Sequence, residues 1–236
     1  EECGELLEVI IGRCADFATL SPGQLAIDPV SRLHIERQSL PGHEDINREM
    51  SEVVDVLRDC GVEVKRPVEI RGVCPLFVRD IACVIDEMFF KTNTIPERAG
   101  EFDAIQSIAG QQPFQIHELP PTVRLEGGDV LGFGEYIFIG YNSSDFDAYQ
   151  TARTNQAALS AIKAFFPEKK VIGLELHKSN RSSKRNTLHL DCAFMPLPNR
   201  WAMIYEDAFV NKADIKLLEN VFSGRLFRIG LSEMLR

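Results

Sequence analysis

Short apolar runs alternate with amphipathic segments along this chain. Leu6–Arg13 is apolar and β-branched, which is typical of a buried strand. The apolar residues from Ile46 to Cys60 recur every three or four positions, which predicts a helix that Gly61 ends. Further helices are predicted over Arg98–Ile108, after Ser144 and after Asn211. The remaining predicted strands are Val62–Arg66, Pro75–Ile85, Met88–Thr92, Thr122–Leu131, Tyr136–Tyr141, Lys170–Leu176, Leu188–Phe194, Trp201–Tyr205 and Arg225–Leu231.

The order of these elements is a pair of strands, then a helix, then another strand, repeated with variation. It predicts the α/β fold class. No low-complexity linker interrupts the pattern, so we expect one domain over residues 1–236. The segment His177–Asn186 is rich in Lys, Arg, Ser and Asn, and we interpret it as a solvated connection between strands.

Composition narrows the function classes. The chain has 236 residues, 44% of them hydrophobic, enough to bury one sizeable core. Its net charge of −9 argues against a nucleic-acid or anionic-membrane binder but is compatible with a small cationic ligand. No apolar run is long enough to predict a transmembrane helix, and the first residues do not resemble a signal peptide.

The cysteines show no C-x-x-C spacing, which excludes zinc-ribbon and thioredoxin-type motifs. Without a secretion signal, we expect reduced, buried thiols and a cytoplasmic protein. The six positions are Cys3, Cys14, Cys60, Cys74, Cys83 and Cys192.

Three segments place charged residues in apolar, strand-like contexts. The first contains Asp80, the second Glu126 and Asp129, and the third His189 and Asp191. Burying a charge is costly unless it is paired, so one interpretation is Arg–Asp pairing that only stabilises the fold. Three such segments in one chain favour a functional cluster instead. That cluster is a metal site, a general acid/base site or a pocket for a cation.

The residue types favour a flat organic cation. One histidine with carboxylates would suit Mg²⁺ or Mn²⁺, but Phe77 close to Asp80 suits a guanidinium better, so we expect no metal. If residues 188–194 form a strand, His189 and Asp191 point to the same face. The Gly127-Gly128 pair predicts a tight turn, a close backbone approach to a ligand, or a plain bulge.

Five motifs occur in a telling order: LLEVIIGR at Leu6–Arg13, F-x-R-D at Phe77–Asp80, L-E-G-G-D-V-L at Leu125–Leu131, A-R-T-N at Ala152–Asn155 and H-L-D at His189–Asp191. With these motifs the chain resembles the guanidino-group-modifying enzymes: arginine deiminase, dimethylarginine dimethylaminohydrolase and the amidinotransferases. The resemblance implies an α/β-propeller, the pentein fold, built from ββαβ modules with fivefold pseudosymmetry. About four of the five modules would be present.

The resemblance implies covalent catalysis with Glu126 as the catalytic carboxylate and His189 as the general acid/base. A cysteine thiolate attacks the guanidinium carbon, His189 protonates the departing amine, and water or an acceptor amine attacks the thiouronium. In the family this cysteine lies in the fifth module, so we expect it beyond residue 236. The abrupt end after Ser232 also suggests an incomplete C-terminus. Cys192 and Cys74 are interpreted as packing residues, Cys192 facing away from His189.

The resemblance also implies substrate-binding residues. Asp80 and Asp191 match carboxylates that hold the guanidinium nitrogens, and Phe77 matches an aromatic residue packed near them. Arg153 matches a residue that holds the substrate's α-carboxylate, the alternative being an exposed helix arginine. No cofactor is implied, and the partner is a small guanidine compound; a homo-oligomer is left open.

Three functions remain. Glu126 favours a C–N hydrolase over an amidinotransferase, because the amidinotransferase branch tends to have Asp there. Asp191 favours an unmethylated guanidine such as arginine, since methylation removes N–H donors. The third function is a guanidine-binding protein without catalysis, should the chain truly end at Arg236.

Overall fold

The computed structural model describes residues 3–14, 26–111, 115–144 and 151–230. The chain divides into two compact units, which we call the N-terminal unit (Gly4–Leu119) and the C-terminal unit (Pro120–Arg236, with the first three residues). Both units have mixed α/β structure with small sheets, as the sequence predicts. The single domain expected from the sequence stays a prediction.

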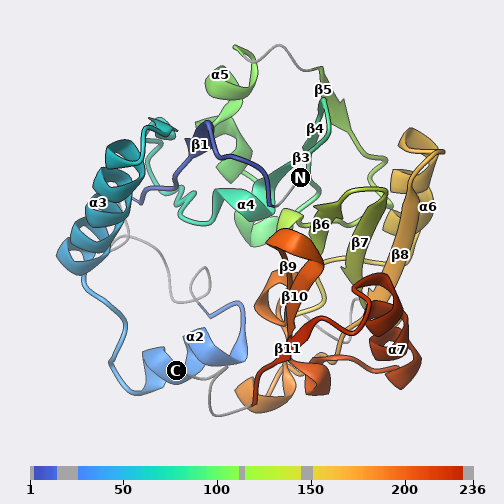
Figure 1. The fold of residues 1–236 in the computed structure, drawn as a ribbon. Coiled ribbons are helices and arrows are strands. Elements are labelled where there is room, and N and C mark those ends of the chain that lie inside the picture. Colours follow the sequence, from blue (N-terminus) through green and yellow to red (C-terminus); the bar gives the residue numbers. More distant parts are fainter. Residues whose placement is uncertain (1–2, 15–25, 112–114, 145–150, 231–236) are drawn as a thin grey trace. The chain divides into compact units, whose positions relative to one another are not determined.

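The N-terminal unit contains a two-stranded parallel sheet, β1-β2, and a three-stranded sheet, β3-β4-β5 (Figure 1). In the described part of the chain, two helices lie between β1 and β2, and short helical segments separate β4 from β5. The described elements are β1 (Glu8–Ile10), α2 (Pro29–Glu36), α3 (His43–Asp59), β2 (Glu63–Lys65), α4 (Val78–Ile81), β3 (Ala82–Ile85), β4 (Met88–Lys91), α5 (Gln106–Ala109) and β5 (Ile116–Glu118).

The C-terminal unit contains two three-stranded sheets, β6-β7-β8 and β11-β10-β9. A helix precedes the last strand of each, and α6 packs along β8 (Figure 1). The described elements are β6 (Val130–Phe133), β7 (Tyr136–Tyr141), α6 (Ala157–Phe165), β8 (Lys170–Glu175), β9 (Phe194–Leu197), β10 (Trp201–Ile204), α7 (Lys212–Val221) and β11 (Leu226–Arg228).

All three of these three-stranded sheets have the same topology. The first two strands form an antiparallel hairpin, and the third strand returns parallel to the second after a helical segment. A parallel partner requires such a crossover, because a tight turn reverses the chain direction. This is the predicted order of strand pair, helix and strand. The propeller closure and the count of four modules stay predictions.

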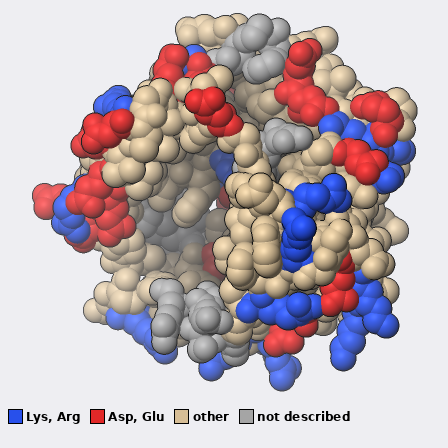
Figure 2. Space-filling view, viewed as in Figure 1, with Lys and Arg blue, Asp and Glu red and all other residues tan. Residues whose placement is uncertain are grey.

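The helix α3 shows why the hydrophobic spacing is a good predictor. Ile46 and Val54 are buried, while charged side chains occupy the solvent side and give the red and blue surface over α3 in Figure 2. The chain leaves the helix at Gly61, whose φ of +82° is in the left-handed region. The sequence analysis missed α2, although Asp28 caps it through its carboxylate and Pro29 opens it.

Two predicted strands that carry site residues are wrong at their centres. The segment Pro75–Ile85 becomes extended only at Ala82, because Val78–Ile81 form the helical turn α4. In Leu188–Phe194, residues Leu190–Cys192 form a 3-10 turn, and the strand starts at Phe194. In both cases backbone hydrogen bonds across three residues replace strand pairing.

Other boundaries also differ from the prediction. Thr122–Leu131 is extended at Glu126, turns at Gly127–Asp129 and enters β6 at Val130. The predicted helix Arg98–Ile108 is broken into short helical segments around Gly100. The helix expected after Ser144 begins at Ala157, and residues 145–150 of that prediction lie outside the described residues, as do residues 231–236 with Ser232.

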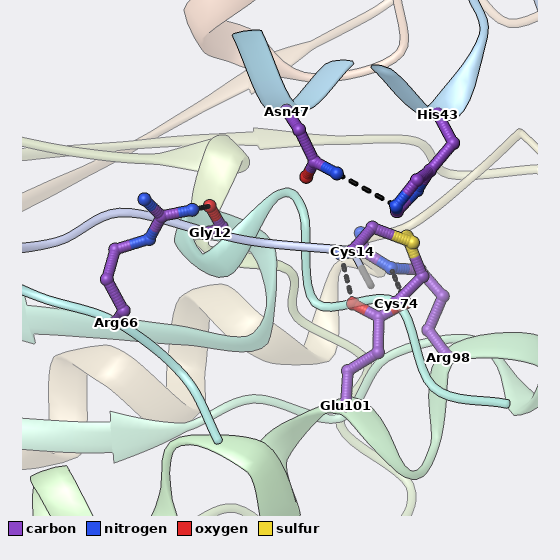
Figure 3. Close-up of a disulfide and its surroundings, with 8 residues drawn as sticks. All are labelled: Gly12, Cys14, His43, Asn47, Arg66, Cys74, Arg98 and Glu101. Carbon is purple, nitrogen blue, oxygen red and sulfur yellow. Dashed lines mark hydrogen bonds and ion pairs between the residues drawn. A yellow bond between two sulfur atoms is a disulfide. The ribbon is translucent and has the colours of Figure 1, made fainter. Parts of the chain in front are cut away.

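Cys14 and Cys74 form a disulfide, which corrects the expectation of reduced thiols for this pair (Figure 3). The two chain segments approach closely because Gly12 has no side chain: a Cβ there would lie 1.8 Å from the Leu76 carbonyl oxygen. The Arg13 amide also donates to the Pro75 carbonyl at 3.3 Å. Redox state therefore could not be inferred from cysteine spacing alone.

None of the helices within the described ranges combines the length and apolar character that crossing a bilayer requires.

Candidate active site

A buried histidine and two buried carboxylates meet in the C-terminal unit. His189 is 4% exposed, Asp129 1% and Glu126 0%. The Nδ1 atom of His189 lies 3.3 Å from Asp129 Oδ2, and its Nε2 atom lies 3.5 Å from Glu126 Oε2. The imidazole is therefore held between two acidic groups out of contact with bulk water.

Asp129 is fixed from three directions. Its Oδ1 accepts the backbone N–H of Leu190 at 2.9 Å, and its Oδ2 accepts the Thr154 hydroxyl at 2.6 Å in addition to facing His189. Burial opposes ionisation of Asp129, but the charge and hydrogen bond of His189, with Lys178 and Thr154, outweigh it. The pKa of Asp129 is therefore below its ordinary value, so the group is an anion at neutral pH.

Glu126 faces an arginine of the same unit. The Nη1 atom of Arg153 donates to the two carboxylate oxygens of Glu126 at 3.4 and 3.3 Å, and Arg153 is 1% exposed. Arg153 lies before α6 and is buried, so the alternative of an exposed helix arginine is wrong. Its predicted role in holding a substrate carboxylate stays a prediction.

The A-R-T-N segment connects Glu126, which is extended, with the residue that follows β7. Thr154 accepts the backbone N–H of Glu126 at 3.2 Å through its hydroxyl, and its carbonyl accepts the Asn142 amide at 3.1 Å. Asn155 bonds both its backbone and its side chain to Arg124 and its side chain to the Thr122 carbonyl. These contacts hold Glu126 and Asp129 at opposite ends of the Gly127-Gly128 turn, as the predicted tight turn requires.

A glycine in β7 leaves room for Asp129. A Cβ on Gly140 would lie 2.7 Å from Asp129 Oδ1 and 2.8 Å from the Leu190 Cβ. The carboxylate and the His189 segment therefore pack directly on the backbone of the central strand. The aromatic core of this unit supports them, with ring contacts among Phe138, Phe194 and Phe222.

The sequence predicted that Asp191 and His189 lie on the same face of a strand, and this prediction is wrong. His189 is extended, but the 3-10 turn at Leu190–Cys192 ends the alternation of faces. The Asp191 carboxylate accepts the Cys192 thiol at 3.6 Å. Cys192 is exposed rather than a core residue, but burial of its sulfur and then the charge of Asp191 raise its pKa to about 12.

Phe77 and Asp80 lie together in the N-terminal unit at α4. Phe77 is 66% exposed, whereas Asp80 is buried and accepts Arg98 Nη1 at 2.6 Å. The Arg98 guanidinium also donates to both oxygens of Glu101 and to the Phe77 carbonyl. Glu101 and Arg98 appear beside the disulfide in Figure 3. The interpretation of Asp80 as part of an Arg–Asp pair is thus realised here, and its substrate-binding role stays a prediction.

Three residues of the C-terminal unit were missed or underrated by sequence analysis. Asp129 was noted but given no role, Thr154 was not singled out, and Lys178 was assigned to a solvated loop. The Lys178 ammonium instead donates to the Thr187 and Leu188 carbonyls at 2.7 Å each. Nothing in the spacing of the sequence indicates that these side chains turn inward.

The arrangement suits proton transfer. Because a carboxylate can only accept, Asp129 orients His189 with its Nδ1–H toward Oδ2 and its Nε2 toward Glu126. Glu126 and His189 also carry ligand atoms of the kind that a metal ion uses, and Glu126 is already paired with the guanidinium of Arg153. The chemistry best matched to this geometry is general acid/base catalysis next to a cationic group.

No family model matches the sequence. Among curated proteins, the chain is 30% identical over 165 residues to the uncharacterised protein YkgA of Bacillus subtilis (strain 168). This match covers 69% of the chain and 51% of YkgA, so the chain spans about half the length of that relative.

Solved structures match more of the chain. The N-terminal domain of ArgZ, an arginine dihydrolase from the ornithine-ammonia cycle in cyanobacteria, aligns with a TM-score of 0.69 at 19% identity over 82% of this chain and 67% of that one. DDAH from Pseudomonas aeruginosa, complexed with citrulline, aligns with a TM-score of 0.70 at 17% identity over 98% of this chain and 79% of that one. These likenesses show that the chain has the pentein-type fold of the guanidino-group-modifying enzymes.

Proposed function

We propose that the protein hydrolyses a C–N bond in the guanidino group of arginine or a related amine. The observation that supports this most directly is the buried His189 between Asp129 and Glu126, in a fold shared with an arginine dihydrolase and DDAH. Glu126 already faces the guanidinium of Arg153, which supports a site whose charge and hydrogen-bond acceptors suit a planar cation.

In the proposed mechanism, a cysteine thiolate from the chain beyond residue 236 attacks the guanidinium carbon. As the C–S bond forms and the C–N bond breaks, His189 gives its proton to the departing amine. His189 then takes a proton from water, which attacks the thiouronium carbon and releases the thiolate. Glu126 stabilises the cationic carbon centre and its protons.

The proposed substrate is unmethylated. Asp191 would accept hydrogen bonds from guanidinium N–H groups that dimethylation removes. We therefore expect L-arginine to be preferred to N,N-dimethylarginine. Phe77, Asp80 and Arg153 keep the substrate-binding roles that the resemblance implies. No cofactor or metal is proposed, so EDTA should leave turnover unchanged.

The test uses the protein expressed from its complete gene and incubated with L-arginine. Hydrolysis predicts ammonia with citrulline. Ornithine with an amidino group transferred to an added amine would instead identify an amidinotransferase, and arginine binding in calorimetry without any turnover would identify a binding protein.

Two variants and their matched controls make the test specific. His189→Ala and Glu126→Gln should each lower kcat by about 10²-fold or more, the usual range for a lost general acid/base. The two controls, His34→Ala in α2 and Glu52→Gln in α3, change exposed residues and should each leave kcat unchanged. Near-full turnover by His189→Ala would overturn the assigned role.

A further inference from the structure

The loop that precedes His189 is closed by an inward-pointing lysine. Lys178 is half-buried, and its Nζ donates to the carbonyl oxygens of Thr187 and Leu188 at 2.7 Å each. These two peptide units come immediately before His189. The ammonium therefore fixes the backbone conformation of the two residues that precede His189.

The same loop is fastened at its base by backbone bonds. The Thr187 amide donates to the His177 carbonyl at 2.9 Å, and the His177 amide donates to the Ala208 carbonyl at 2.8 Å. Within the loop, the side chain of Asn186 accepts the Ser179 amide at 3.1 Å. These bonds give the loop a defined conformation, and the Lys178 ammonium at its base reaches across to the residues that precede His189.

The lysine also lies in the field of the acidic pair. Burial lowers the pKa of Lys178 from its ordinary value, the negative charge of Asp129 opposes that shift, and the charge of Arg153 adds to it. Lys178 in turn is one of the charges that keep Asp129 ionised. A half-buried ammonium that loses hydration is costly, and its hydrogen bonds to two carbonyl oxygens offset part of that cost.

We propose that Lys178 is a positioning residue for the guanidine-hydrolysing reaction, which holds the Thr187 and Leu188 carbonyls so that His189 stays aimed between Asp129 and Glu126. This inference rests on the proposed function for its kinetic consequence, but its structural part, the coupling of Lys178 to the His189 ring, does not.

The test compares Lys178→Met, which keeps the side-chain length but removes the charge and donors, with Lys178→Arg, which keeps both. Lys163→Met is the matched control, because Lys163 also donates to two backbone carbonyls, those of Pro167 and Lys169, but is exposed on α6. If Lys178 only stabilised the fold, Lys178→Met and Lys163→Met should have the same effect on kcat.

The expected kinetic result is a fall in kcat of about 10- to 100-fold for Lys178→Met with KM changed less than about threefold, since a misplaced catalytic group costs turnover more than binding. Lys178→Arg should recover most of kcat, and Lys163→Met should lose none. An unchanged kcat in Lys178→Met, or an equal loss in Lys163→Met, would overturn the proposal.

An NMR readout separates this inference from the proposed function. The ring nitrogens of His189 are followed through a pH titration in the wild type and in the variants. Lys178→Met should move the titration midpoint to higher pH, because a positive charge beside Asp129 is removed, and should alter the ring shifts. If the wild type turns over no guanidine, the proposed function fails while this titration still decides the coupling. If Lys178→Met does not fold, the spectrum of Lys178→Arg decides whether Lys178 is coupled to His189. The proposal expects the His189 ring shifts of Lys178→Arg to match the wild type. Displaced ring shifts in this variant, which retains the charge, would contradict the proposal.

Discussion

The Oδ2 atom of Asp129 lies 3.3 Å from Nδ1 of His189, a residue 60 positions later in the chain. The Leu190 amide binds the other oxygen of the same carboxylate, so Asp129 holds both the ring of His189 and the backbone that follows it. The carboxylate therefore determines the tautomer of the imidazole and its direction toward Glu126.

Replacement of Asp129 by asparagine should lower kcat by about 10²-fold, because the amide no longer stabilises the protonated ring and allows the wrong tautomer. The measurement is steady-state turnover of arginine, with the exposed Asp207→Asn as the matched control. Turnover close to the wild type in Asp129→Asn would show that Asp129 has no part in orienting His189.

Acid should destabilise the protein partly through Asp129. Its pKa in the folded protein is below 3.8, so the unfolded chain binds a proton at a higher pH than the folded one. The stabilising contribution is present above about pH 4 and is lost as the pH falls through the lower, folded value. Urea unfolding between pH 3 and pH 6 should show the wild type and Asp129→Asn converging toward low pH. A constant difference across that range would contradict this linkage.

Gly140→Ala should damage both stability and activity. The new Cβ would lie 2.7 Å from Asp129 Oδ1 and 2.9 Å from Leu176 Cδ1, closer than atoms can pack. Overpacking of this kind costs about 1–3 kcal/mol and should displace Asp129. Gly132→Ala in the neighbouring strand β6 is the control, since nothing lies within 4 Å of its Cβ position. Equal urea midpoints for the two variants would rule out the clash.

The sequence predicted the repeating part of the fold and the polar residues, but not their local geometry. Hydrophobic spacing identifies α3, which buries one face, and a continuous apolar run identifies β7, whose central residues are buried on both faces. It fails at Pro75–Ile85 and Leu188–Phe194, where a buried helical turn has the same apolar composition as a strand. Such turns depend on tertiary hydrogen bonds that local propensity does not include.

The sequence predicted some residues of the candidate site and missed others. Glu126, Arg153 and His189 were identified and meet in the C-terminal unit. Lys178 was not, because a Lys-rich loop is usually solvated and only the folded chain shows that one ammonium turns inward. The cytoplasmic location and the oligomeric state stay predictions.

Arg98→Met should strongly destabilise the N-terminal unit. Arg98 is buried and its guanidinium is shared by Asp80 and Glu101, so the substitution removes a hydrogen-bonded cation from two buried carboxylates. Breaking a buried ion pair from one side costs about 3–5 kcal/mol.

The matched control is Arg48→Met, which removes an exposed pair with Asp45 on α3 and should cost at most about 1 kcal/mol. The free energy of unfolding from urea titrations compares the two. A loss for Arg98→Met no larger than that for Arg48→Met would mean that the cluster contributes nothing to the fold.

Cys192 should react slowly with thiol reagents, although it is exposed. Burial of the sulfur and the charge of Asp191 raise its pKa to about 12. At pH 8 about one molecule in 10⁴ then carries the reactive thiolate. Iodoacetamide labelling followed by mass spectrometry should therefore modify the exposed Cys60 well before Cys192.

Asp191→Asn should accelerate labelling of Cys192, because the neighbouring negative charge is removed. The experiment also tests where the nucleophile lies. A thiol that is protonated at neutral pH is a poor attacking group, which argues against Cys192 as the nucleophile. If Cys192 were instead labelled first, and Cys192→Ser abolished turnover in the complete protein, the nucleophile would lie in this unit and the proposed mechanism would have to be rebuilt around it.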